Sequence, residues 1–93
     1  MRTLTTTIKR EFLAAIVART KKIEYREIKP YWTLKFTGIM LPFKLRLING
    51  MDKKAPEVTV LINKITIDGQ HGKDYELHIR KVLDVKNWPI STN

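Results

Sequence analysis

The sequence predicts an α+β domain, in which one main helix and a short second helix accompany a curled sheet of about five or six mostly antiparallel strands. One stretch near the N-terminus has apolar residues at helical spacing, and several later stretches have them at every second position. The chain has 93 residues, of which 43 % are hydrophobic, and no cysteine. This composition predicts a single folded domain over residues 1–93 without disulfides or thiolate metal sites.

The N-terminal third predicts a strand and then the main helix. Residues 3–6 are rich in β-branched threonine and predict a short strand. Thr7 is the expected N-cap of a helix from Ile8 to Arg19. One face of this helix is apolar, and we expect it to belong to the core rather than to a ligand site. This face comprises Ile8, Phe12, Ala15 and Ile16, with Leu13 and Val17 alongside.

The rest of the chain predicts strands separated by turns and one short helix. Pro30 suits the first turn of a helix over residues 31–35. A phase slip of the alternating pattern at Asn63 indicates a bulge, as expected where a small sheet curls into a barrel. The expected strands are residues 23–26, 43–47, 58–67 and 75–85.

The ends of the chain carry no predicted anchor. Charged residues at positions 9–11 interrupt any early apolar run, and no stretch approaches the length that spans a membrane. Residues from about 88 to 93 are expected to form a C-terminal tail. We therefore expect a soluble cytoplasmic protein that has no membrane partner.

Positive charge is concentrated in the N-terminal half. The net charge is +9; residues 1–46 carry 11 Lys and Arg against 3 Glu, whereas residues 47–93 carry 7 against 6 acidic residues. A basic field attracts polyanions and accelerates their encounter with the protein. The charge distribution thus favours a nucleic-acid partner, although lysines also serve solubility alone.

The motif K-x-x-E-x-R at Lys21, Glu24 and Arg26 is the densest group of ligand-binding residues in the sequence. Because side chains alternate along a strand, Glu24 and Arg26 should share one face. A guanidinium grips phosphate with two hydrogen bonds, a lysine supplies a mobile point charge, and a carboxylate accepts from a base amine. Tyr25 and Trp32 offer rings for base stacking, although Trp32 also suits core packing.

This order of elements resembles the ASCH domain, a family with the PUA-like β-barrel fold. The resemblance rests on the helix, the K-x-x-E-x-R motif, the stretch EYREIKPYW and the Asn-Gly turn after a strand, and it covers about residues 3–87. The family usually has glycine two residues before the motif lysine, where this chain has Arg19.

The resemblance implies a small PUA-like barrel with an RNA- or nucleoside-directed cleft. We expect RNA or another nucleic acid to be the partner, with no cofactor and no metal. The candidate nucleic-acid-binding residues are Arg19, Lys21, Lys22, Glu24, Tyr25, Arg26 and Trp32.

Two other function classes remain open at this point. Some ASCH proteins resemble hydrolases that remove an acyl group from modified cytidine, and others resemble ribonucleases. Glu24 stands where the first group has its threonine, so an enzyme would depend on Lys21, Glu24 and the adjacent Thr20. A protein-interaction module for an acidic partner is the third class.

Overall fold

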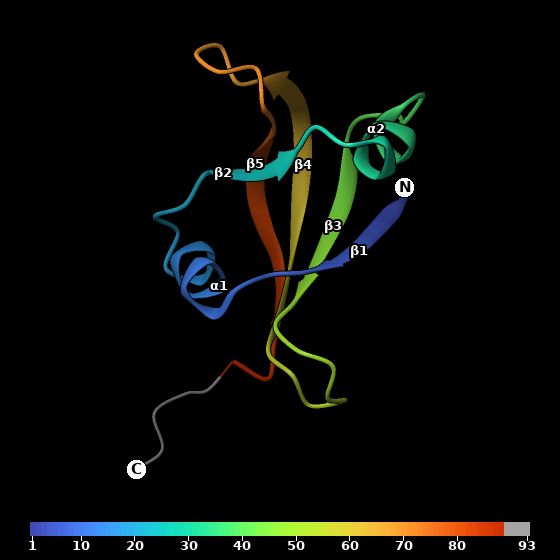
Figure 1. Ribbon diagram of the computed structural model, residues 1–93. Coiled ribbons are helices and arrows are strands. Elements are labelled where there is room, and N and C mark those ends of the chain that lie inside the picture. The colour runs from blue at the N-terminus through green and yellow to red at the C-terminus, as the bar shows by residue number, and fades with distance from the viewer. Residues whose placement is uncertain (89–93) are drawn as a thin grey trace.

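The computed structural model describes residues 1–88 and contains five strands and two helices in that range (Figure 1). It confirms an α+β fold with a main N-terminal helix and a short second helix. Neither helix of the described range is long and apolar enough to cross a membrane. The elements are β1 (Thr3–Thr7), α1 (Arg10–Val17), β2 (Ile23–Glu27), α2 (Pro30–Phe36), β3 (Phe43–Ile48), β4 (Glu57–Ile67) and β5 (Asp74–Lys86).

All five strands form one mixed sheet in the order β1-β3-β4-β5-β2. The β1–β3 pair is parallel, and the other three pairs are antiparallel. The sheet's edges are therefore β1 and β2, the two strands that flank α1 in the sequence.

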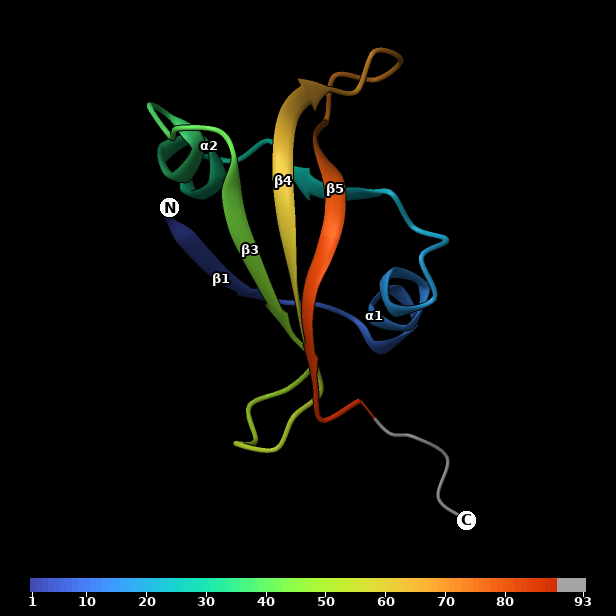
Figure 2. The same ribbon diagram turned by 180° about the vertical axis from the view of Figure 1, so that it is seen from behind.

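Strong twisting brings the two edges of the sheet toward each other. In both views β1, β2 and α1 lie on the same side of the long β4–β5 hairpin, so the sheet forms a half-barrel (Figures 1 and 2). The inner face of this half-barrel holds the core, because the buried residues of β3 and of the first half of β4 alternate with residues that are half-buried or exposed. Three central members of the core, Leu45, Val60 and Leu77, are fully buried.

Helix α1 begins two residues later than the sequence predicts. Thr7 is the last residue of β1 rather than an N-cap, and the backbone N–H of Ile8 donates to Ile48 O at 3.0 Å. This extension of the sheet holds Ile8 outside the helix. Lys9 takes the N-cap position in an extended conformation and makes no side-chain capping bond. The helix also ends at Val17, before the predicted Arg19.

Three β-bulges interrupt the pairing of the long β4–β5 hairpin. Ile62 and Lys64 pair with the consecutive residues Ile79 and His78, which leaves Asn63 as the extra residue of a bulge. This confirms the phase slip predicted at that position. The other two bulges lie on β5. Ile79 and Lys81 face the consecutive residues Ile62 and Leu61, so Arg80 has no opposing residue. Val82 and Asp84 face the consecutive residues Val60 and Thr59, so Leu83 has none either.

Aromatic residues join α2 to the core. Phe36 is buried, and its ring stacks with Trp32 at 5.4 Å between centroids and meets Tyr75 edge-on at 5.0 Å. Trp88 also packs against the core, and the Arg10 guanidinium lies 5.1 Å from the centre of its ring. The expected tail therefore begins with a docked residue, and its remaining residues, 89–93, lie outside the described range.

Candidate functional site

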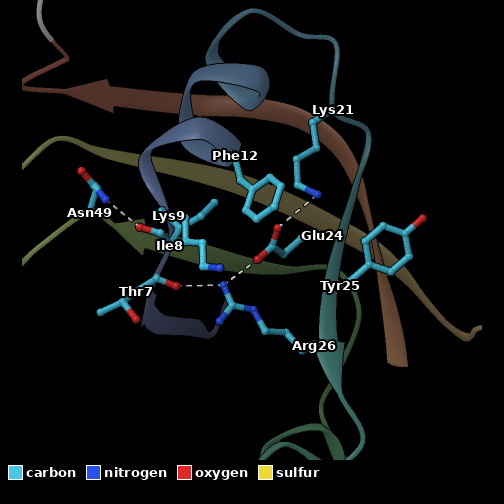
Figure 3. A pocket seen from close by; sticks show the side chains of 9 residues that line it. All are labelled: Thr7, Ile8, Lys9, Phe12, Lys21, Glu24, Tyr25, Arg26 and Asn49. Atoms are coloured by element: carbon cyan, nitrogen blue, oxygen red, sulfur yellow. Dashed lines mark hydrogen bonds and ion pairs between the residues drawn. The ribbon is translucent and has the colours of Figure 1, made fainter. Parts of the chain in front are cut away.

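A cleft of about 620 Å³ opens beside the two edge strands of the half-barrel. Its walls come from the end of β1, the start of α1, the segment leading into β2, β2 itself and the turn after β3 (Figure 3). The cleft therefore lies where the sheet does not close. It is lined by Thr7, Ile8, Lys9, Phe12, Lys21, Glu24, Tyr25, Arg26 and Asn49.

The K-x-x-E-x-R motif converges on this cleft through Glu24. The Glu24 side chain is buried, with 4 % of the residue exposed, and it pairs with both cations of the motif. Its Oε1 lies 3.5 Å from Lys21 Nζ, and its Oε2 accepts from Arg26 Nη2 at 2.5 Å (Figure 3). The strand parity predicted for Glu24 and Arg26 is thus confirmed by their direct contact.

Two aromatic rings flank the Lys21 ammonium. Its Nζ lies 5.1 Å from the ring centre of Phe12 and 5.2 Å from that of Tyr25, which are cation–π distances (Figure 3). Phe12 is 42 % exposed and Tyr25 is 49 % exposed. The prediction that Phe12 belongs to the core is therefore wrong: Leu13 and Ile16 provide the buried face of α1, and Phe12 points into the cleft.

Arg26 links the two edges of the sheet. Its Nη2 donates to the backbone oxygen of Thr7 in β1 at 2.8 Å, while the residue itself belongs to β2. The guanidinium also lies over the Trp32 ring at 5.4 Å. Its Nε atom is buried without a hydrogen-bond partner among the described residues. These contacts hold the guanidinium at the cleft wall. Its other terminal nitrogen, Nη1, takes part in none of these hydrogen bonds.

Besides Phe12, the structure adds four cleft residues that sequence reasoning missed. Thr7, Ile8, Lys9 and Asn49 reach the cleft because β1 runs beside β3 and ends next to the turn that follows it. Asn49 Nδ2 donates to Ile8 O at 2.9 Å and so joins the two segments. The Asn-Gly turn signal at this position could have drawn attention to Asn49, but its partner lies 41 positions away.

Three of the predicted binding residues lie outside this cleft. Arg19 and Lys22 line a neighbouring pocket. Trp32 is partly buried against the core, and its ring lies 5.4 Å from the Arg26 guanidinium. The cleft thus gathers Lys21, Glu24, Tyr25 and Arg26 from the predicted set.

The candidate catalytic threonine does not join the motif. The Thr20 hydroxyl donates to the backbone oxygen of Ala15 at 3.1 Å, and Thr20 does not line the cleft. Because this hydroxyl is hydrogen-bonded to the C-terminal turn of α1, it does not face the cleft that Lys21 and Glu24 line. The predicted set for an enzyme is therefore not assembled around this cleft.

The cleft chemistry suits a ligand with negative charge and a flat apolar part. Three cations, Lys9, Lys21 and Arg26, line it against one carboxylate, so the charge at its wall is positive. The exposed rings of Phe12 and Tyr25 add apolar surface. Phosphate and a nucleobase combine these two properties.

Comparisons with known proteins identify no relative. No protein-family model matches the chain, and no match was found among curated proteins or among solved structures.

Proposed function

We propose that this protein is an RNA-binding module of the ASCH type, with a PUA-like half-barrel, and that it holds a nucleotide of single-stranded RNA in the cleft. In this proposal Lys21 and Arg26 bind a phosphate, and the rings of Phe12 and Tyr25 stack with a base. Glu24 positions the two cations, because its buried side chain already forms ion pairs with both.

One observation carries the proposal: the basic motif and two exposed aromatic rings share one cleft. Backbone phosphates supply affinity to cationic grooves, and exposed rings stack with bases of any sequence. Single strands suit the rings better than a duplex, because their bases are free to unstack. The position of the motif after the helix agrees with the ASCH resemblance.

The direct test is a titration with RNA at several salt concentrations. A labelled single strand of about eight nucleotides and a duplex of the same length are compared by fluorescence anisotropy. We expect the single strand to bind more tightly, with affinity falling as salt rises from about 50 to about 200 mM. Lys21→Ala should weaken binding about tenfold, since it removes a charge-assisted contact of roughly 1.4 kcal/mol.

Lys44→Ala provides the matched control for this experiment. Lys44 is an exposed lysine of β3 that does not line the cleft, and its removal changes the net charge equally. Absence of binding at low salt, or equal effects of the two variants, contradicts the proposal. Denaturing gels of the same samples check the RNA itself: intact RNA agrees with binding, and shortened RNA would instead indicate a ribonuclease.

A further inference from the structure

A second pocket, of about 260 Å³, lies beside the cleft and is lined mainly by cations. We call it the basic pocket. It lies between the end of α1, the segment entering β2, and β5, and none of its lining residues is acidic. Its lining residues are Ile16, Arg19, Lys21, Lys22, Ile79, Arg80, Lys81 and Val82.

The β5 bulge at Arg80 explains how two neighbouring cations reach the same pocket. Successive side chains of a regular strand point to opposite faces of the sheet. Arg80 is the unopposed residue of the bulge, so the alternation is broken there, and both Arg80 and Lys81 line the pocket. Bulges commonly redirect a side chain in this way near functional sites.

Arg19 reaches the pocket from a strained backbone position. Its φ is +65°, in the left-handed region that glycine adopts readily and other residues avoid. The turn it forms is closed by the N–H groups of Thr20 and Lys21, which both donate to Ala15 O. A cationic side chain therefore stands where the backbone geometry favours glycine, which is the kind of outlier that points to function.

Four of the five cations of the basic pocket are free of a counter-charge; the fifth, Lys21, pairs with Glu24. Within residues 1–88, these four form no ion pair with a carboxylate and are exposed, and Arg19 Nη1 also donates to the backbone oxygen of Val17. The four are Arg19, Lys22, Arg80 and Lys81. Lys21 lines both the basic pocket and the cleft, so the two sites are adjacent. Like charges gathered without a counter-charge repel each other, and an anion relieves that repulsion.

We infer that the basic pocket binds a phosphodiester of the RNA whose neighbouring nucleotide occupies the cleft. This inference rests on the proposed function and extends it, since it assigns Arg80 and Lys81 of β5 to the RNA interface. Lys21 lies between the two phosphates, and the RNA strand runs from β2 across the end of α1 toward β5.

The test compares the salt dependence of RNA binding in two double variants. Arg80→Ala/Lys81→Ala removes two cations of the basic pocket, and Lys53→Ala/Lys54→Ala removes two exposed lysines of the β3–β4 loop that line neither site. For a single strand, each lost phosphate contact lowers the slope of log K against log salt by about 0.7. We expect a decrease of about 0.7 to 1.4 in the first variant and an unchanged slope in the second. Arg80→Lys/Lys81→Arg should restore the wild-type slope.

The outcomes separate this inference from the proposed function. If wild-type protein binds RNA and both double variants have the same slope, the basic pocket is not part of the interface, and the cleft proposal stands. If wild-type protein binds no RNA, the proposed function fails. NMR titration with inorganic phosphate then tests whether the basic pocket binds an anion at all. Saturable shifts of the Arg80 and Lys81 amides would then support an anion site, and their absence would overturn it.

Discussion

At the scale of single residues, Glu24 is the centre of the site. It is one of two buried charged residues among the described ones, and its carboxylate contacts Lys21 and Arg26, whose side chains are 15 % and 17 % exposed. Removing one member of a buried ion-pair group leaves the remaining charges without a counter-charge. The resulting loss of folding stability is larger than the stability that an exposed ion pair contributes. Glu24 therefore has a structural role as well as a role in binding.

The Glu24→Gln variant tests this role. We expect it to lower the free energy of unfolding by about 2 kcal/mol, because two half-buried cations lose the counter-charge that a buried carboxylate supplies. Urea unfolding measures the change. Glu27→Gln is the control: Glu27 pairs with Lys29 on the surface, where both side chains are more than 60 % exposed, and its loss should cost less than about 1 kcal/mol. Equal losses for the two variants would contradict a central role of Glu24.

Arg19 gives a second prediction at this scale, in which stability and binding change in opposite directions. Arg19→Gly removes backbone strain of about 1–2 kcal/mol and adds a chain-entropy cost of about 0.5–1 kcal/mol. We expect the unfolding free energy to rise by up to about 1.5 kcal/mol while RNA binding weakens. Arg19→Ala keeps the strain and loses the charge, so it should weaken binding equally without the gain in stability. Unchanged RNA affinity in both variants would show that Arg19 does not contact the ligand.

At the scale of elements, α1 presents two faces with different functions. Leu13 and Ile16 are fully buried, whereas Phe12 is partly exposed in the cleft. The helix is thus a core element on one side and a wall of the candidate site on the other. Substitutions at adjacent positions of this helix can therefore change stability and RNA binding independently.

Phe12→Ala and Leu13→Ala form a matched pair for this helix. Leu13→Ala should lower the unfolding free energy by about 2–5 kcal/mol, as expected for a cavity in the core. Phe12→Ala should cost markedly less stability and reduce RNA affinity by about 1–3 kcal/mol through lost stacking. Thermal or urea unfolding and the anisotropy titration give both quantities. An RNA affinity that survives Phe12→Ala unchanged would remove this ring from the proposed site.

The β3–β4 pair yields a prediction about pH. Arg46 Nε and Nη2 donate to the two oxygens of Glu57 at 2.7 and 2.8 Å, and these hydrogen bonds lower the pKa of Glu57 from its ordinary value. A lowered pKa in the folded state means that the stabilisation is present above the pKa of the unfolded glutamate, about 4.3, and is lost as the pH falls through the folded value.

Glu57→Gln should remove this part of the pH dependence. We expect wild-type protein to be more stable than the variant at pH 7, and the difference to shrink as the pH falls below about 4.3. Urea unfolding between neutral and acidic pH measures the difference. If the difference in unfolding free energy between wild type and variant stayed constant over this pH range, the charge of Glu57 would not contribute to the stability of the strand pair.

At the scale of the whole molecule, local patterns predicted most of the elements but only part of the site. Alternation predicted the strands around Leu45 and Val60 and the bulge at Asn63, because each depends on neighbouring residues. The start of α1 was missed because a bond to Ile48, 40 positions away, holds Ile8 in the sheet. Such pairing is decided by the folded topology and leaves no local signal.

The same reason explains which site residues the sequence revealed. The motif at Lys21, Glu24 and Arg26 lies within six residues, and strand parity predicted the shared face of Glu24 and Arg26. Asn49 lies in the turn after β3 and Arg80 in β5, both far along the chain from the motif, and Arg80 reaches its pocket through a bulge that alternation does not anticipate. The family resemblance and the RNA partner remain proposals that rest on the motif and the shared cleft.

RNA binding at the cleft and the basic pocket is best tested by NMR, by mapping the amides that shift on titration with single-stranded RNA. We expect saturable shifts with one dissociation constant at the cleft and the basic pocket, and none in the β3–β4 loop around Lys53. Absence of shifts, or the largest shifts on a surface remote from both sites, would contradict this expectation. The amides expected to shift are those of Lys9, Lys21, Tyr25, Arg26, Asn49, Arg80 and Lys81.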